Sequence, residues 1–330
     1  MIWYKEQSDI VISTRVRLAR NIDGIPFPDA LKNKDEAIDK IKNAIFNSNS
    51  TLSDDFTDVK LEEMTGIEKQ RLAEKHLISS LMLKNGKCGC LINKDETMSI
   101  MIMEEDHIRQ QVILGGYKLD EAYEICDRVD DVLSENLDFA FDEKIGYLTA
   151  CPTNTGTGLR ASVMLHLPGL CMTGKIERII ESAGNIGIAV RGYYGEGSKA
   201  EGCFFQISNQ ITTGATEKEI IDRVKNVTDQ IIAFEKEARN KLINENKTEL
   251  SDKVYRSYGV LKYSRSISSK EAISLISDVL FGKIMGIIEE EGKMSPMECI
   301  VLTAPAHMED GNNTPKERDE KRASFLRNNI

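Results

Sequence analysis

Short apolar stretches bounded by turn residues recur along the first part of the chain and predict β-strands. They lie at residues 8–20 (SDIVISTRVRLAR), 87–92 (KCGCLI), 97–103 (TMSIMIM) and 144–150 (KIGYLTA). The turn NKDE joins the second and third stretches. Two further strands, IGIAVRG and CFFQISNQ, are expected on either side of the glycine-rich turn YYGEGSKAEG.

A second pattern, in which apolar residues recur with the period of an α-helix, covers other parts of the chain. Residues 38–83 carry it with a break near NSNSTLSDD, and residues 108–136 predict one long helix. From about residue 250 onward the pattern is helical throughout. Residues that start helices, by capping or by an adjacent proline, are Thr216, Ser268, Ser295 and Thr314.

The order of these elements predicts an α+β fold. Strands are followed by helices without a regular strand–helix–strand alternation, which favours an antiparallel sheet with flanking helices. A boundary is expected near residues 245–260, so that residues 1–250 form one domain and residues 251–330 a helical C-terminal domain.

Composition narrows the class of protein. The chain has 330 residues, a net charge of -10 and 41% hydrophobic residues, enough for one large domain or two smaller ones. An acidic balance argues against nucleic acid as a general partner. The chain contains no run of 18 apolar residues, so no membrane span is predicted, and the N-terminus does not resemble a signal peptide. The seven cysteines do not have the spacing of a disulfide framework, which predicts reduced thiols and a cytoplasmic location.

The stretch CPTNTGTGLRAS, residues 151–162, combines a cysteine, two glycines and an arginine. GTGLRA nearly matches the dinucleotide fingerprint, but the surrounding strands lack the order that this motif needs. No Walker phosphate loop occurs in the chain. A plain turn would explain the glycines, although it would not explain Cys151 and Arg160 together.

Five arginines suggest a site for phosphate. Arg15 and Arg17 lie two apart on a predicted strand and therefore point to one face. Burying two guanidinium groups there is costly unless an anion meets them, and the alternative is a solvated edge strand. The other arginines lie at the ends of strand-like segments or in glycine-rich turns: Arg109, Arg160 and Arg191.

Acidic residues follow one of the predicted strands. EEDH, residues 104–107, comes directly after TMSIMIM, and adjacent carboxylates at that point favour a cationic neighbour. The alternative is a helix N-terminus, where acidic side chains complement the helix dipole.

Taken together, four motifs in this order resemble one family. STRVRLARN, EEDHIR, CPTNTGTGLRASV and RGYYGEGSKAEG are similar to the catalytic domain of phosphagen (guanidino) kinases, and most of all to its bacterial protein-arginine kinase branch. FQISNQ also matches that branch. The resemblance implies a sheet flanked by helices, Mg-ATP as phosphoryl donor and a guanidinium as acceptor. Magnesium would be held mainly through the ATP phosphates, without a protein metal site.

The resemblance also implies roles for individual residues. Glu105 and Glu196 match the carboxylates that clamp the guanidinium, and Cys151 matches the reactive cysteine beside it. The residues that match the ATP site are Ser13, Thr14, Arg15, Val16, Arg17, His76, Arg109, Arg160, Ala161, Ser162, Val163, Met164, Arg191, Gly192, Tyr193, Tyr194, Gly195 and Glu196. Two positions depart from the family pattern, Met103 where asparagine is frequent and Thr155 where an aliphatic residue is usual.

Two features favour an arginine in a protein as the acceptor. Kinases of small guanidines in this family carry a helical domain before the arginine strand, whereas fourteen residues precede Arg15 here, which implies an open site. The segment RDEKRA near the C-terminus fits a pattern that binds phosphoarginine in the protein-directed branch. Its residues are Arg318, Asp319, Arg322 and Ala323, and the two arginines share a helix face.

The resemblance further implies a homodimer, an activating adaptor protein, a heat-shock repressor and the Clp protease machinery as partners. Substrates would be proteins with exposed arginines. Two alternatives remain open: a kinase for free arginine or another small guanidine, and a non-catalytic regulator that binds phosphoarginine.

Overall fold

The computed structural model describes residues 2–6, 9–84, 86–193, 201–290, 292–311 and 313–330. Within them, an eight-stranded sheet has the order β2-β3-β4-β5-β1-β8-β10-β9. Its strands are β1 Val11–Arg20, β2 Phe56–Asp58, β3 Gly89–Asn93, β4 Met98–Ile102, β5 Ile108–Gly115, β8 Leu159–His166, β9 Ile188–Gly192 and β10 Phe204–Asn209. A separate small hairpin consists of β6 Phe141–Asp142 and β7 Gly146–Tyr147.

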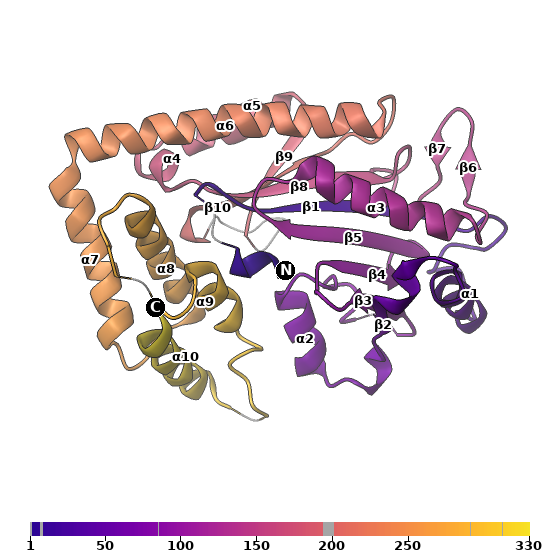
Figure 1. Cartoon of the computed structure of the whole chain (residues 1–330), viewed down its shortest axis with the longest axis horizontal. Coiled ribbons are helices and arrows are strands. Elements are labelled where there is room, and N and C mark those ends of the chain that lie inside the picture. Colours follow the sequence, from indigo (N-terminus) through magenta and orange to yellow (C-terminus); the bar gives the residue numbers. More distant parts are fainter. Residues whose placement is uncertain (1, 7–8, 85, 194–200, 291, 312) are drawn as a thin grey trace. The chain divides into compact units, whose positions relative to one another are not determined.

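Helices flank the sheet and form the C-terminal part of the chain (Figure 1). The α-helices are α1 Asp35–Phe46, α2 Gly66–Glu74, α3 Leu119–Ser134, α4 Pro168–Met172, α5 Ile176–Asn185, α6 Glu217–Glu245, α7 Lys247–Tyr263, α8 Ser269–Ile284, α9 Pro296–Leu302 and α10 Pro315–Asn329. Short 3-10 helices are η1 Trp3–Lys5, η2 Thr51–Asp54, η3 Leu61–Glu63 and η4 Glu201–Cys203. The predicted α+β class with an antiparallel sheet and flanking helices is confirmed.

Two compact units divide the chain. Unit 1 comprises Met1–Trp3, Ser13–Ser162 and Ser208–Lys225, and unit 2 comprises Tyr4–Ile12, Val163–Ile207 and Asn226–Ile330. Strands β1, β8 and β10 therefore contribute residues to both units. Because this division does not follow chain order, the predicted boundary at residue 250 stays a prediction.

In unit 1, antiparallel pairing fixes the central strands. β5 pairs with β1 on one side and with β4 on the other, and α3 packs against β5. Val16, Ile100 and Val112 are almost fully buried in this region. The face of a sheet that a helix covers needs apolar side chains, and the strand register places Val16, Ile100 and Val112 on one shared face.

In unit 2, helices α7, α8, α9 and α10 pack together (Figure 1). Ser268 caps α8 and Ser295 caps α9, each by accepting a backbone N–H three residues on. Thr314 and Glu317 form a capping box at the start of α10, and Pro315 occupies its first turn. These predicted helix starts are confirmed, as is the capping box between Thr216 and Glu219.

The long helix predicted over residues 108–136 is wrong. Residues Ile108–Gly115 form strand β5, and helix α3 starts only at Leu119. The strand contains three polar residues in a row, Arg109, Gln110 and Gln111, and this spacing suggested the period of a helix. Inside the fold, however, Gln110 and Gln111 are buried and hydrogen-bonded. The strand predicted at residues 144–150 is also shorter than expected, because only Gly146–Tyr147 pairs.

Candidate active site

Three arginines lie on one face of the sheet in unit 1. On β1, Arg17 pairs with Gln111 of β5, and Ala19 pairs with Arg109. Because side chains two apart share a face and paired residues point the same way, Arg15, Arg17 and Arg109 project together. The sequence prediction for Arg15 and Arg17 thus agrees with the strand register.

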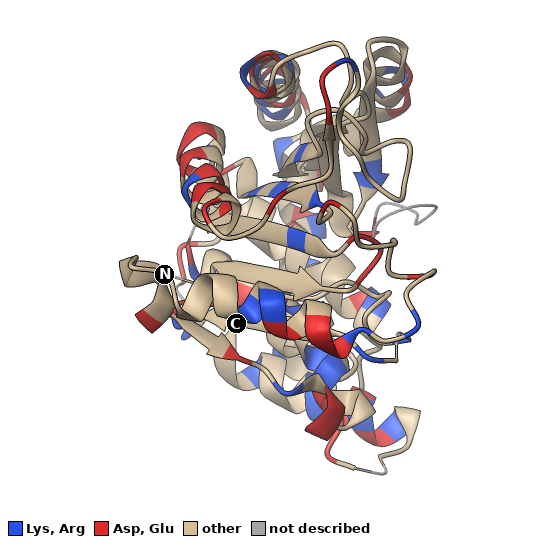
Figure 2. Ribbon diagram, turned by 90° about the vertical axis from the view of Figure 1, so that its right-hand side faces the viewer, with Lys and Arg blue, Asp and Glu red and all other residues tan. Residues whose placement is uncertain are grey.

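Arg160 joins them from strand β8. The Ala19 N–H donates to the Gly158 carbonyl over 3.0 Å, and the Ser162 hydroxyl donates to the Arg15 carbonyl over 3.2 Å. These two bonds bracket Arg160 on β8 and bring it beside Arg17 on β1. We call Arg15, Arg17, Arg109 and Arg160 the arginine cluster. Figure 2 shows blue segments on strands of the sheet, whereas the helices carry both charges.

Burial and mutual repulsion lower the pKa values of two arginines in the cluster. Burial lowers the pKa of Arg15 to about 10, helped by the positive charges of Arg109 and Arg160. Burial also lowers the pKa of Arg17, together with the charges of the other three arginines. The Arg17 Nε is buried without a hydrogen-bond partner in the described structure. A site with this many cations fits a polyphosphate anion, which would relieve the repulsion.

A buried carboxylate anchors one member of the cluster. Both oxygens of Glu104 accept from the Arg109 Nη1, at 2.5 and 2.7 Å, and the Glu104 side chain is fully buried. Burial alone would raise the pKa of Glu104, but the charge and the hydrogen bonds of Arg109 lower it overall. Glu104 is therefore a fixed anion that orients Arg109.

His76 lies next to the cluster in unit 1. Burial lowers its pKa to about 3, with further lowering by Arg15 and Arg17. Its ring lies 5.5 Å from the ring of Trp3, and its backbone has a φ of 63°. The imidazole is consequently neutral at pH 7, so it can contact a nucleotide without adding to the positive charge.

The acidic stretch forms a tight turn between β4 and β5. Met103 starts it with a φ of 60°, a conformation that asparagine adopts more readily than methionine. This explains why asparagine suits the position where the sequence departs from the family pattern. The Met103 N–H donates to the His107 carbonyl over 3.0 Å, which closes the turn. The turn aims Glu104 and Glu105 at different partners.

Glu105 is half-buried, and the nearby side chain of Cys151 lowers its pKa slightly against larger effects that raise it. Burial raises the pKa of Glu105, and the carboxylates of Asp106 and Glu104 raise it further. Arg109 acts in the opposite direction. A carboxylate with a raised pKa is a stronger base than an ordinary glutamate. The structure thus brings together two residues predicted for the guanidinium end of the site.

Asp106 ties the two halves of this arrangement together. Its Oδ1 accepts from the Asn21 Nδ2 and from the Ala150 N–H, both at 2.7 Å. Asn21 follows β1, and Ala150 precedes Cys151, so one carboxylate links the arginine strand, the acidic turn and the cysteine loop. Sequence reasoning missed Asp106 and Asn21. Asn21 ends the motif STRVRLARN, which was the one available signal.

The cysteine loop is held by threonine hydroxyls. The Thr149 hydroxyl donates to the Cys151 carbonyl over 2.7 Å, and Cys151 Sγ lies 3.0 Å from the Thr153 hydroxyl. Thr155, the second departure from the family pattern, has its hydroxyl 3.0 Å from that of Thr149. The Thr212 hydroxyl donates to the carbonyls of Thr153 and Thr155, another contribution that sequence reasoning missed.

Two glycines let this loop approach its neighbours. Gly156 has a φ of 111°, and a Cβ there would lie 2.3 Å from the Thr212 carbonyl oxygen. Gly158 has a φ of 66°, and a Cβ there would lie 2.5 Å from the Ala19 carbonyl oxygen. Both conformations and both distances require glycine. The glycines therefore form part of a packed turn that leads from Cys151 to Arg160.

The remaining predicted residues lie in several places. Within unit 1, Thr14 donates to the Gly116 carbonyl and Val16 is fully buried, so neither side chain is free to meet a ligand. Ser13, Ala161 and Ser162 also belong to unit 1, and unit 2 contains Val163, Met164, Arg191, Gly192 and Tyr193. The residues Tyr194, Gly195 and Glu196 lie outside the described part of the chain.

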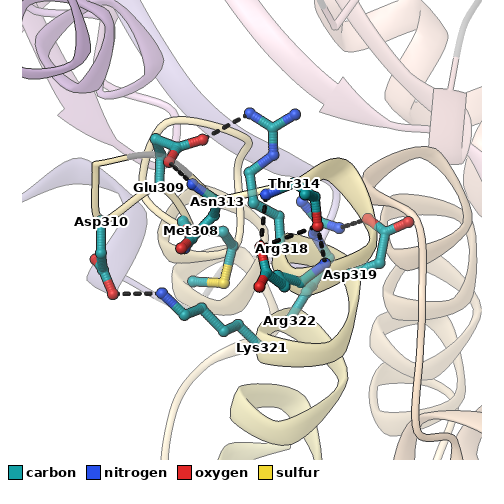
Figure 3. Close-up of polar contacts among 10 residues, drawn as sticks. Met308, Glu309, Asp310, Asn313, Thr314, Arg318, Asp319, Lys321 and Arg322 are labelled. Atoms are coloured by element: carbon teal, nitrogen blue, oxygen red, sulfur yellow. Dashed lines mark hydrogen bonds and ion pairs between the residues drawn. The ribbon is translucent and has the colours of Figure 1, made fainter.

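The C-terminal motif forms a separate cluster on α10 in unit 2 (Figure 3). Arg318 is 30% exposed and donates to Glu309 over 2.9 Å. Arg322 is almost fully buried and donates to the carbonyls of Thr303 and Ile267 over 2.8 and 2.9 Å. Arg322 also pairs with Asp319. Ala323 is buried beside them.

Family models match most of the chain. The model described as ATP:guanido phosphotransferase, C-terminal catalytic domain, matches residues 36–238. A second, described as protein-arginine kinase McsB C-terminal domain, matches residues 247–330. The first match alone spans more than half of the chain.

The chain belongs to the protein-arginine kinase family of ATP:guanido phosphotransferases.

Relatives of this kinase align with it over nearly the full length of both chains. It is 47% identical to the protein-arginine kinase of Clostridium acetobutylicum, over 98% of this chain and 97% of the relative. The protein-arginine kinase of Bacillus subtilis is 43% identical, over 99% and 93%. Among solved structures, a lombricine kinase aligns with a TM-score of 0.62 at 25% identity, covering 72% of this chain and 69% of that chain. The kinase is accordingly an ATP-using phosphotransferase that acts on a guanidino group.

Two further properties of the described residues bear on the site. None of the helices there is long and apolar enough to span a membrane. Nor do three or more histidine, cysteine, aspartate or glutamate side chains converge there in a way that could hold a metal ion. The donors that converge in unit 1 are guanidinium groups, which suit phosphate oxygens directly.

Proposed function

We propose that this kinase transfers the γ-phosphoryl group of Mg-ATP directly to the guanidinium of arginine side chains in proteins. The observation that supports this most is that Glu105 and Cys151 lie near each other beside the arginine cluster. Arg109 connects the two ends, since it belongs to the cluster and binds Glu104, the neighbour of Glu105. Groups suited to a phosphate and to a guanidinium thus lie within one unit.

The chemistry requires a base and alignment. A guanidinium has a pKa above about 12 and is a poor nucleophile while protonated. Glu105 would accept two N–H groups, aim one nitrogen at the γ-phosphorus and take up the proton as the P–N bond forms. Its raised pKa suits this role. Glu196 would form the second arm of the clamp, and Cys151 would place its sulfur against the guanidinium.

The arginine cluster would bind the ATP phosphates. Phosphoryl transfer depends mainly on alignment and on neutralising charge in the transition state. Four guanidinium groups supply positive charge, and Glu104 fixes the direction of one of them. Magnesium, held mainly by the ATP phosphates, would supply further positive charge. His76, beside the cluster, would contact the nucleotide, and the family resemblance assigns Arg191 to nucleotide binding as well.

Comparison of two acceptors tests the proposal. The kinase is incubated with Mg-ATP and either free arginine or an unfolded, arginine-rich protein, and acid-labile phosphate is measured. Transfer to the protein is expected. Transfer to free arginine alone would reject the protein substrate in favour of a small-guanidine kinase. Failure of both acceptors, with an activating adaptor protein supplied, would favour a phosphoarginine-binding regulator without catalysis.

We further propose that phosphoarginine binds on α10 and activates the kinase. Arg318 is the more exposed of the two motif arginines, and Asp319 can receive the guanidinium of the ligand. Arg322 donates to two backbone carbonyls, so its main role is to hold α10 against the residues around Ile267 and Thr303. A phosphoryl group would have to replace Glu309 as the partner of Arg318.

Regulated proteolysis is the cellular role we propose. Arginine phosphorylation would mark proteins for degradation by Clp proteases in the cytoplasm, and a heat-shock repressor would be among the substrates. The kinase would work as a homodimer with an adaptor protein. These roles rest on membership of the protein-arginine kinase family. Co-purification of the kinase with an adaptor and a Clp subunit from stressed cells would test them.

A further inference from the structure

Two cysteines of unit 2 lie side by side, and neither was predicted to act in catalysis. Cys171 belongs to α4 and Cys203 ends η4, these two segments pack together, and the two thiols are close enough to shift each other's pKa. Both side chains are partly exposed, unlike the buried thiols of Cys90, Cys126 and Cys299. We propose that Cys171 and Cys203 form a reversible disulfide when the kinase meets a peroxide.

The backbone holds the two thiols together through Leu167. The Leu167 N–H donates to the Cys203 carbonyl over 2.9 Å, and the Cys171 N–H donates to the Leu167 carbonyl over 3.1 Å. One residue therefore binds the main chain of both cysteines. Their proximity follows from the fold and does not depend on a chance side-chain rotamer.

Neighbouring contacts fix both segments in place. Glu235 accepts the backbone N–H groups of Gly169 and Leu170, both over 2.9 Å, and so anchors the start of α4. Gly202 has a φ of 65°, and a Cβ there would lie 2.7 Å from the Ile273 side chain of α8. Cys203 itself has a φ of 58°, a conformation that is rare for any residue but glycine. Disulfides form readily only where the two backbones already have a suitable separation.

Charge favours reaction at Cys203. The neighbouring Cys171 thiol lowers the pKa of the Cys203 thiol, against the opposing effect of burial, and Lys253 lowers it as well. The Cys203 thiol and burial raise the pKa of Cys171. Thiolates react with peroxides and thiols do not, so Cys203 is the site of first attack and Cys171 resolves it.

The reaction balances in two steps. The Cys203 thiolate attacks hydrogen peroxide, the O–O bond breaks, and after proton uptake Cys203 sulfenic acid and one water are formed. The Cys171 sulfur then attacks the sulfenic sulfur, the S–O bond breaks, and hydroxide leaves as a second water with the thiol proton. Two thiols and one peroxide thus yield one disulfide and two waters. A dithiol reductant reverses the change.

The disulfide would close a chain loop from Cys171 to Cys203. That loop contains α5, β9 with Arg191, and Tyr193 directly after β9. Both Arg191 and Tyr193 are predicted to bind the nucleotide. The cross-link does not require any of the catalytic residues, and it would form whichever guanidinium the kinase phosphorylates. Cytoplasmic disulfides of this kind are usually transient and respond to redox conditions.

Peptide mapping tests the proposal on the full chain. Trypsin releases residues 161–175, 200–218 and 145–160, which contain Cys171, Cys203 and Cys151 respectively as their only cysteine. The kinase is titrated with hydrogen peroxide, free thiols are alkylated, and digests are analysed by mass spectrometry without reduction. We expect peptides 161–175 and 200–218 to appear joined, lighter than their sum by two hydrogens, and to separate after dithiothreitol.

Three variants control the assignment. The joined peptides should persist in Cys151→Ser and vanish in Cys171→Ser and Cys203→Ser. In Cys171→Ser, Cys203 should accumulate as a sulfenic acid that dimedone traps. The oxidised wild type should also denature at a higher temperature than Cys171→Ser treated in the same way, because a closed loop restricts the unfolded chain. The proposal is overturned if the Cys151 peptide is fully oxidised while the other two peptides remain unjoined, even if a variant fails to fold.

Discussion

Replacing Gly156 with alanine tests whether the loop from Cys151 to Arg160 depends on its close packing. At a φ of 111°, any residue with a side chain is strained by about 1–3 kcal/mol. The new Cβ would also lie 2.3 Å from the Thr212 carbonyl oxygen, which is about 1 Å short of ordinary van der Waals contact. Because that oxygen accepts the Thr157 N–H over 2.9 Å, its displacement disturbs the loop itself.

The two effects together predict a loss of about 2–5 kcal/mol in the free energy of unfolding. A shift of about 1 Å between Cys151 and Arg160 would lower turnover about hundred-fold, because in-line transfer depends on alignment. Urea denaturation measures the first effect, and the rate of phosphoryl transfer to an unfolded protein measures the second.

Gly214→Ala is the matched control. Gly214 has a φ of 70° and belongs to the same unit, and a Cβ there would meet no atom within 4 Å. Alanine there should cost about 1–2 kcal/mol from the backbone alone and leave turnover near the wild-type rate. If Gly156→Ala and Gly214→Ala matched in both denaturation midpoint and turnover, the reasoning about the packed loop would be refuted.

Three further predictions concern charge. Glu105→Gln should abolish transfer and leave ATP binding intact by calorimetry; unchanged turnover would reject Glu105 as the base. Asp106→Asn keeps the Oδ1 acceptor but removes a negative charge that raises the pKa of Glu105. Since Glu105 must be deprotonated to act, the acidic limb of the rate–pH profile should move to lower pH, and an unmoved limb would contradict this electrostatic account. Glu309→Gln keeps an acceptor for the Asn313 N–H but weakens the hold on Arg318, so phosphoarginine should activate at lower concentration. A dose response equal to that of the wild type would show that Glu309 does not compete, whereas Arg318→Ala should remove activation and spare basal transfer.

Local patterns in the sequence predicted many of the helices and strands. Thr216 with Glu219 predicted a helix start because capping depends on residues three apart, and the bonds are present. The helix predicted over residues 108–136 was wrong because Arg109, Gln110 and Gln111 are polar residues in a central strand. Gln110 and Gln111 are buried there because they bond to Asp130 and to the carbonyl of His76, partners that the local sequence pattern does not reveal.

Site prediction shows the same limit. Arg15 and Arg17 share a face because strand geometry alone places them there, and the register of β1 against β5 adds Arg109. The bond between Asn21 and Asp106 joins residues 85 positions apart, so neither residue type nor spacing could have indicated it. Long-range hydrogen bonds that hold the acidic turn and the cysteine loop together became visible only in the structure.

The most direct test of the central claim locates the phosphate on the acceptor. An unfolded, arginine-rich protein is incubated with Mg-ATP and either the wild type or Glu105→Gln, and its peptides are sequenced by mass spectrometry under neutral conditions that preserve P–N bonds. Phosphate on arginine side chains with the wild type, and none with Glu105→Gln, is the predicted result. Phosphate on serine or threonine, or equal arginine phosphorylation by both proteins, would contradict the account.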